Sequence, residues 1–115
     1  MTELDGLREE LRQFARERDW EQFHSPKNLA AALSVEASEL LEIFQWLTEE
    51  QSRRLGPDAL ASAQEEIADV LLYLIRLADG LGIDPLDAAR KKMTANARKY
   101  PVDKARGTAR KYDEL

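Results

Sequence analysis

Apolar residues recur at helical spacing along this chain, and no useful stretch alternates with the period of two that strands require. One such stripe comprises Leu4, Leu7, Leu11 and Phe14. Helices are predicted at residues 2–18, 26–47, 58–79 and 84–98. Proline marks the connection before each of the last three, and short connections favour antiparallel neighbours. The pattern therefore predicts an all-α protein built as a four-helix bundle.

The third predicted helix differs from the others because it is apolar nearly all round between Ile67 and Leu77. A helix on the surface of a small bundle carries only one apolar stripe. A soluble monomer rarely leaves a large apolar patch exposed. We therefore expect a homo-oligomer, with a dimer as the minimum, in which a second subunit covers part of this helix.

Length and residue usage limit the class of protein. At 115 residues and 13.1 kDa the chain is one domain, predicted at residues 1–101, with a basic tail at 102–115. No cysteine is present, which excludes disulfides, thiolate metal sites and cysteine nucleophiles. The longest apolar run, residues 70–75, is far shorter than the roughly 20 residues that span a bilayer. With no signal-peptide pattern at the acidic N-terminus, we expect a cytoplasmic protein without a membrane partner.

Charge is unevenly distributed along the chain. Residues 90–115 hold nine Lys/Arg against three acids, a net charge of +6, whereas residues 1–89 hold eight against nineteen, a net charge of −11. An acidic body repels a nucleic-acid backbone, so we expect no nucleic-acid partner. The basic end could instead hold an anion such as a phosphate-bearing small molecule.

Two pairs of acids share a helix face at neighbouring turns: Glu36 with Glu39, and Glu66 with Asp69. Such a set would suit a hard cation, Mg²⁺ or Mn²⁺. The alternative is that these are ordinary solvated helix charges. A di-iron centre needs Glu-x-x-His twice, and the one histidine, His24, lies in a predicted loop.

Both tryptophans, Trp20 and Trp46, lie at predicted helix ends. Either they are packing residues, or their rings stack on a nucleobase beside the acidic set. His24 has the simpler interpretation of a capping or hydrogen-bonding residue.

The combined motifs resemble a known family. Glu36-x-x-Glu39, a gap of 26 residues and Glu66-x-x-Asp69 resemble the paired motif of the all-α (MazG-like) nucleoside triphosphate pyrophosphatases. The flanking sequence is similar to the dCTP pyrophosphatase branch in residues 14–30, in Phe44-Gln45-Trp46, in residues 69–74, in residues 92–102 and in the tail at 106–112.

This resemblance implies a homo-oligomeric enzyme, a dimer or a tetramer, that hydrolyses a nucleoside triphosphate to the monophosphate and pyrophosphate. It implies dCTP or a modified dCTP as the favoured substrate and sanitation of the nucleotide pool as the role. By the family pattern, Mg²⁺ would be bound by Glu36, Glu39, Glu66 and Asp69. The substrate loop would be Trp20, Glu21, Gln22, Phe23 and His24, with Trp46 and Tyr73 lining the base and sugar pocket. The triphosphate would be reached by Lys92, Asn96, Lys99 and Tyr100, from the same or a neighbouring subunit.

One position departs from that branch, which tends to carry a histidine where this chain has Leu11. A preference for another base therefore stays open, either for dUTP or for a broad range of nucleoside triphosphates. So does a non-catalytic helical oligomerisation module. Phosphoribosyl-ATP hydrolases are weaker candidates because they lack the Trp20–His24 loop. The sequence leaves Glu36, Glu39 and Glu42 open as the general base.

Overall fold

The computed structural model describes residues 2–115, and this part of the chain consists of helices joined by turns, with no strand. The elements in order are α1 (Glu3–Glu17), η1 (Glu21–Phe23), α2 (Pro26–Phe44), α3 (Glu49–Ser52), α4 (Pro57–Gly80), α5 (Pro85–Lys99), α6 (Val102–Ala105) and η2 (Tyr112–Glu114). No helix in residues 2–115 is long and apolar enough to cross a membrane. The prediction of an all-α fold is confirmed.

Local capping explains where the long helices begin. The backbone N–H of Asp5 donates to the Thr2 hydroxyl over 3.1 Å, and the N–H of Asn28 donates to the Ser25 hydroxyl over the same distance. These caps satisfy amide groups that the first turn of a helix leaves unpaired. Proline occupies the first turn of α2, α4 and α5, where its missing N–H costs nothing.

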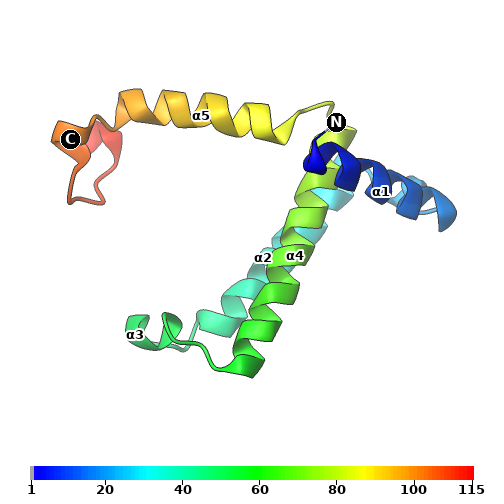
Figure 1. The fold of residues 1–115 in the computed structure, drawn as a ribbon, viewed down its shortest axis with the longest axis horizontal. Helices are drawn as coiled ribbons and strands as arrows, with labels where there is room; N and C mark the ends of the chain where they lie inside the picture. Colours follow the sequence, from blue (N-terminus) through cyan, green and yellow to red (C-terminus); the bar gives the residue numbers. More distant parts are fainter. Residues whose placement is uncertain (1) are drawn as a thin grey trace. The chain divides into compact units, whose positions relative to one another are not determined.

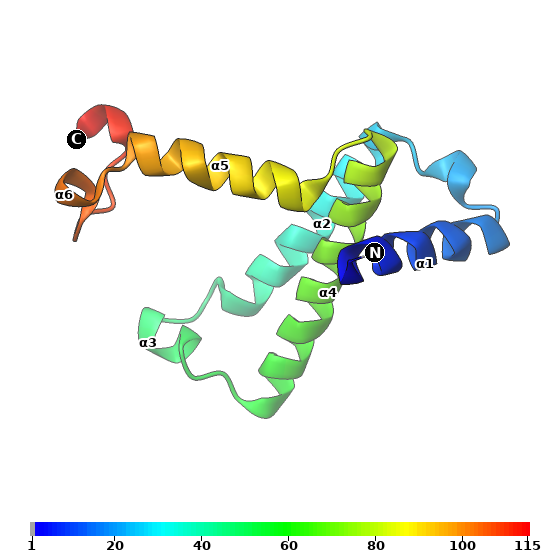
Figure 2. The ribbon, with the colours of Figure 1, turned by 45° about the horizontal axis from the view of Figure 1, so that its top comes forward.

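The chain divides after Gly82 into two compact units. In the first unit, α2 and α4 lie side by side and run antiparallel, and α1 packs on α4 (Figures 1 and 2). The buried apolar residues of this unit are Ala15 of α1, Leu29 of α2, and Ala63, Ile75 and Ala78 of α4. The α2–α4 pair therefore forms the centre of the unit.

A second apolar face of α4 is left uncovered in the single chain. Ile67 is 56% exposed, Leu71 46% and Leu74 42%. Burying such side chains is worth about 1.5–3 kcal/mol each, so their exposure is unfavourable. Covering of this face by another copy of the chain stays a prediction.

The second connection differs from the prediction. Helix α2 ends at Phe44, before Trp46, and the short helix α3 was not predicted. Thr48 and Gln51 form a capping box at its start, with the Gln51 N–H donating to the Thr48 hydroxyl over 3.1 Å. This Thr-x-x-Gln pattern is the sequence signal that could have located α3.

The second unit contains α5, α6 and η2. The Tyr112 ring lies 6.2 Å from the Tyr100 ring, and the Lys99 Nζ lies 4.8 Å from the centre of the Tyr112 ring. The chain end therefore folds back on the end of α5. The four-helix bundle and the division of a 1–101 domain from a 102–115 tail stay predictions.

Replacement of Leu29 by alanine should destabilise the protein strongly. Its side chain is only 2% exposed, and cavities left by Leu→Ala changes in a core cost about 2–5 kcal/mol. Urea unfolding followed by helical circular dichroism measures this loss. The matched control is Leu81→Ala, whose side chain is 53% exposed. Equal unfolding free energies for the two variants would contradict the packing described here.

Candidate active site

Three of the predicted carboxylates meet where α2 lies against α4. Glu36 and Glu39 project from successive turns of α2, and Glu66 projects from α4. One carboxylate oxygen from each residue lies within 4.8 Å of the other two. The antiparallel pairing of the two helices therefore brings Glu66 close to residues that lie 30 and 27 positions before it in the sequence.

The close approach of these carboxylates is electrostatically costly. The neighbouring Glu66 carboxyl, together with burial, raises the pKa of Glu36, and the Glu36 carboxyl raises the pKa of Glu39. The Oε2 atoms of Glu36 and Glu66 are buried and have no hydrogen-bond partner. A close group of carboxylates with buried, unpartnered oxygens fits a hard divalent cation. We refer to Glu36, Glu39 and Glu66 as the carboxylate cluster.

Asp69, the fourth predicted ligand, lies one turn after Glu66 and outside that group of three. Its charge contributes to the raised pKa of Glu36. Its side chain also lines an adjoining cavity. Asp69 therefore stands between the carboxylate cluster and the cavity.

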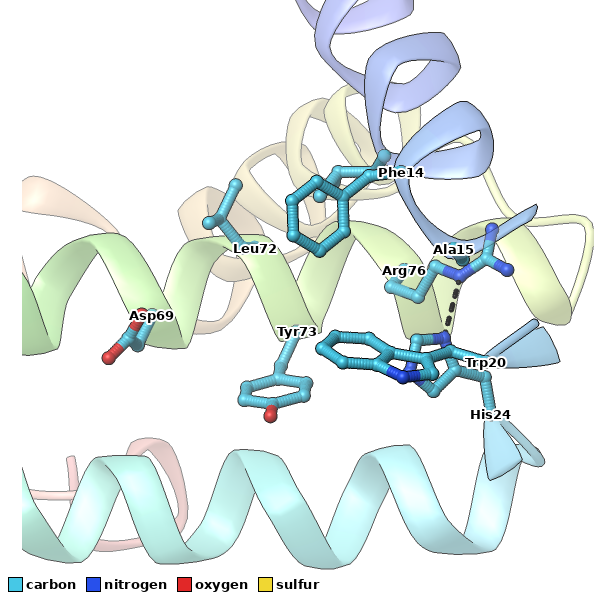
Figure 3. A pocket seen from close by; sticks show the side chains of 9 residues that line it. Phe14, Ala15, Trp20, His24, Asp69, Leu72, Tyr73 and Arg76 are labelled. Atoms are coloured by element: carbon cyan, nitrogen blue, oxygen red, sulfur yellow. Dashed lines mark hydrogen bonds between the residues drawn. The ribbon is translucent and has the colours of Figure 1, made fainter. Parts of the chain in front are cut away.

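This cavity has a volume of about 160 Å³. Its lining residues come from α1, from the segment between α1 and α2, and from α4, as Figure 3 shows: Leu11, Phe14, Ala15, Trp20, His24, Asp69, Leu72, Tyr73 and Arg76. Pockets for whole small molecules are typically about 300–1,000 Å³. The cavity in one chain is therefore large enough for one ring of a ligand rather than for an entire nucleotide.

Aromatic rings form one side of the cavity. The Trp20 ring lies 5.7 Å from the Phe14 ring and 6.3 Å from the His24 ring, with interplanar angles of 66° and 64°. These edge-to-face contacts hold the indole, yet Trp20 remains 44% exposed. An aromatic face that is held in place and partly open can stack on a planar ligand.

The turn that delivers Trp20 has an unusual backbone. Asp19 has a φ of 52°, in the left-handed region that few residues other than glycine adopt. The Gln22 side-chain amide donates to the Asp19 carbonyl oxygen over 3.0 Å and so braces this turn. The bend allows the chain to leave α1 and place Trp20 and His24 against α4.

The predicted substrate loop is only partly in the cavity wall. Trp20 and His24 line it, whereas Glu21, Gln22 and Phe23 form η1 outside the wall, and Phe23 is 58% exposed. Tyr73 lines the cavity as predicted.

Trp46 is not brought to the cavity by this chain. It lies beyond the C-terminal end of α2 and is 87% exposed, whereas Trp20 precedes the start of that helix. A helix of 19 residues is about 28 Å long, so the two rings of one chain cannot hold the same base.

The remaining predicted residues belong to the second unit. Lys92, Asn96 and Lys99 are on α5, and Tyr100 follows its last residue. Lys99 and Tyr100 contact Tyr112, as described above.

Sequence reasoning missed Phe14 and Arg76 as cavity residues. Arg76 is the only charged residue between Val70 and Ala78, in the most apolar part of the chain. A lone cation in such a segment is the signal that could have singled it out. Phe14 carried no comparable signal, because it continues the apolar stripe of α1.

Comparison with known proteins places these features in a family context. A model described as the MazG-like family matches residues 31–115. The chain is 46% identical over 114 residues to dCTP pyrophosphatase 1 of Homo sapiens. The aligned region covers 97% of this chain and 67% of the relative. The chain is 44% identical over 114 residues to dCTP pyrophosphatase 1 of Rattus norvegicus, with coverage of 97% and 67%.

A solved structure shares the fold. The crystal structure of a pyrophosphatase from Archaeoglobus fulgidus matches with a TM-score of 0.83 and 42% sequence identity, covering 88% of this chain and 94% of that chain. The predicted family resemblance is confirmed by these comparisons.

The carboxylate cluster should make the stability of the metal-free protein fall as pH rises. Because the folded-state pKa values of Glu36 and Glu39 are raised above the ordinary 4.5, the folded state binds protons more tightly than the unfolded chain. This contribution is therefore lost as pH rises from about 4.5 through the raised values. A divalent cation should reverse the loss, so Mg²⁺ should raise the unfolding temperature more at pH 7 than at pH 5.

Unfolding temperatures with EDTA or with Mg²⁺, at matched ionic strength, measure this effect. Glu36→Gln should flatten the pH dependence of the metal-free protein and reduce the response to Mg²⁺. Glu65→Gln, on the neighbouring position of α4 outside the carboxylate cluster, is the matched control and should behave as the wild type. An unreduced Mg²⁺ response in Glu36→Gln would contradict the assignment of the metal site.

Proposed function

Since this chain belongs to the MazG-like family, we propose that it is a Mg²⁺-dependent pyrophosphohydrolase that converts dCTP, or a modified dCTP, to the monophosphate and pyrophosphate. The observation that carries the proposal is the carboxylate cluster with its two buried unpartnered oxygens, beside a cavity with an aromatic wall. The named relatives are dCTP pyrophosphatases, which supports the nucleotide class. Its role would be sanitation of the cytoplasmic nucleotide pool.

Glu36, Glu39, Glu66 and Asp69 would hold the metal, for which Mn²⁺ is a second candidate. When bound, the cation supplies positive charge that stabilises the phosphoryl oxygens during attack by water at the α-phosphorus. A carboxylate at the edge of the site would accept the proton of that water, and Glu36, Glu39 and Glu42 are the candidates.

The base and sugar would be held by Trp20, His24 and Tyr73, which line the cavity next to Asp69. We propose that Glu21, Gln22 and Phe23 complete this substrate loop through the η1 turn. Stacking on an aromatic side chain contributes about 1–3 kcal/mol per base. Because Asp69 joins the cavity to the carboxylate cluster, a base seated there would direct its phosphates toward the metal.

Two features support a homo-oligomer, a dimer or a tetramer. Trp46 is 87% exposed and distant from the cavity of its own chain, so it would reach a base only in the site of another copy. The uncovered α4 face of Ile67, Leu71 and Leu74 offers apolar surface for that copy. We propose that Trp46 acts across such an interface.

The basic second unit would bind the triphosphate. Lys92, Asn96, Lys99 and Tyr100 supply ammonium, amide and hydroxyl donors within three turns of chain. This assignment is consistent with the positive charge of residues 90–115.

One specific observation favours a different base preference, either for dUTP or for a broad range of nucleoside triphosphates. Leu11 lines the cavity, so this part of the wall offers no hydrogen bond with which to select a base. The non-catalytic oligomerisation module has less support, since such a module has no use for buried carboxylates without partners.

Pyrophosphate release is the direct test. Purified protein with Mg²⁺ should release pyrophosphate from dCTP or 5-methyl-dCTP faster than from the other common nucleotides. Asp69→Asn should lower turnover at least about 100-fold, the order seen when an electrostatic group is removed from an active site. Glu65→Gln should retain wild-type turnover. If no nucleotide yields pyrophosphate, the proposed enzymatic activity is refuted. A preference for dUTP would favour the alternative base preference.

Lys92→Ala should raise KM by a similar factor for every nucleotide, because the triphosphate is common to all of them. Loss of one charge-assisted hydrogen bond costs about 1.5–3 kcal/mol, or roughly 10- to 150-fold. Lys91→Ala is the matched control, because the Lys91 Nζ is paired with Asp87 at 2.9 Å. Steady-state kinetics over a panel of nucleotides measures both variants. A changed ranking of bases in Lys92→Ala would contradict the phosphate role.

A further inference from the structure

Arg76 makes a specific contact with the histidine of the cavity. Its Nε donates to the Nδ1 of His24 over 3.2 Å, as the dashed line in Figure 3 marks. The Arg76 side chain is only 15% exposed, and both residues line the cavity. The contact joins α4 to the end of the segment that carries Trp20.

Arg76 is itself held by an acidic residue. The Asp79 carboxylate lies 3.7 Å from the Arg76 Nη1 and accepts a hydrogen bond of 2.8 Å from the Nε of Arg12 on α1. A second hydrogen bond joins the Arg12 Nη2 to the same carboxylate, so the pair is bidentate. Asp79 is 14% exposed, and its pKa is lowered chiefly by Arg12. One chain of polar contacts thus connects α1, α4 and the segment between α1 and α2.

The chemistry of this contact fixes the state of the imidazole. A guanidinium group has donors and no acceptor, so the Nδ1 of His24 must be the unprotonated nitrogen. The neutral ring then carries its hydrogen on Nε2. Protonation of Nδ1 would set two N–H groups against each other and is disfavoured.

We propose that Arg76 is a positioning residue: anchored by Asp79 and Arg12, it holds His24 as the neutral tautomer whose Nε2–H is a hydrogen-bond donor in the cavity wall. The inference rests on the proposed function, because the partner of this donor would be an acceptor on the substrate, such as a pyrimidine carbonyl or ring nitrogen or a sugar oxygen. It adds a polar selecting group to a wall that Leu11 leaves apolar.

The charges around His24 agree with this state. The titratable and charged groups that face it or adjoin its contacts are Glu21 on η1, Asp69, Tyr73, Arg76 and Asp79 on α4, and Arg12 on α1. Burial and then the Arg76 charge lower the pKa of His24, against a smaller opposing effect of Glu21. The imidazole therefore stays neutral at pH 7.

The first experiment is performed on the free wild-type protein and needs no turnover. His24 is the only histidine, so ¹⁵N NMR of labelled protein reports its two ring nitrogens without ambiguity. At pH 7 we expect Nε2 to be protonated and Nδ1 to be bare. A ring protonated on Nδ1, or an even mixture of tautomers, would overturn the proposal.

Variants of Arg76 separate its charge from its hydrogen bond. Arg76→Met removes both, so the pKa of His24 should rise and the tautomers should mix. Arg76→Lys keeps the charge but loses the Nε donor, so the pKa should stay low while the tautomer preference weakens. Arg16→Gln removes an α1 guanidinium that does not contact Asp79 and is the control. An unchanged His24 spectrum in Arg76→Met would also overturn the proposal. Circular dichroism checks folding, and the wild-type spectrum decides the tautomer even if a variant fails to fold.

Kinetics then test whether the arrangement serves the substrate. Arg76→Met should raise KM for dCTP about 5- to 10-fold, the loss of one hydrogen bond, while kcat and the Mg²⁺ affinity change less than about twofold. In a His24→Ala background, Arg76→Met should add little, because both changes remove the same interaction. Additive effects would show that Arg76 acts elsewhere. Absence of wild-type turnover would refute the proposed function, whereas the NMR result would stand separately.

Discussion

The candidate active site depends on the packing of α2 against α4, which brings carboxylates together despite their mutual repulsion. Leu29 of α2 and Ile75 of α4 are both buried, and the packing of the two helices brings Glu36 and Glu39 close to Glu66. Removing like charges from water and setting them within 4.8 Å is unfavourable unless a cation neutralises them. Hydrophobic packing therefore supplies the free energy that keeps the carboxylate cluster assembled.

A second set of contacts organises the cavity beside the carboxylate cluster. The left-handed Asp19 turn, the edge-to-face rings of Phe14 and Trp20, and the Arg76–His24 hydrogen bond hold the segment between α1 and α2 against α4. Such a wall needs little rearrangement to receive a planar ring, which reduces the entropy lost on binding. The same chain leaves Trp46 and one face of α4 exposed, so a site that uses all predicted residues would require more than one copy.

Local signals in the sequence predicted much of the helical structure. Ser25-Pro26 and Asp84-Pro85 predicted the starts of α2 and α5 because capping chemistry acts over a few residues. The spacing of Glu36 and Glu39 predicted a shared helix face, because residues three apart lie on neighbouring turns of a helix. The contact between Arg12 and Asp79 spans 67 positions and follows from the crossing of α1 and α4, which no local pattern encodes. Arg76, Phe14 and the distance of Trp46 from the cavity depend likewise on tertiary packing.

We propose that the carboxylates of α2 and α4 bind the catalytic cation beside the aromatic cavity. Crystals of the protein grown with Mn²⁺ and a non-hydrolysable dCTP analogue would test it through the anomalous scattering of manganese. We expect an anomalous peak coordinated by oxygens of Glu36, Glu39, Glu66 and Asp69, with the base against Trp20 and the phosphates at the metal. Manganese bound at another place, or a nucleotide bound away from these carboxylates, would contradict it.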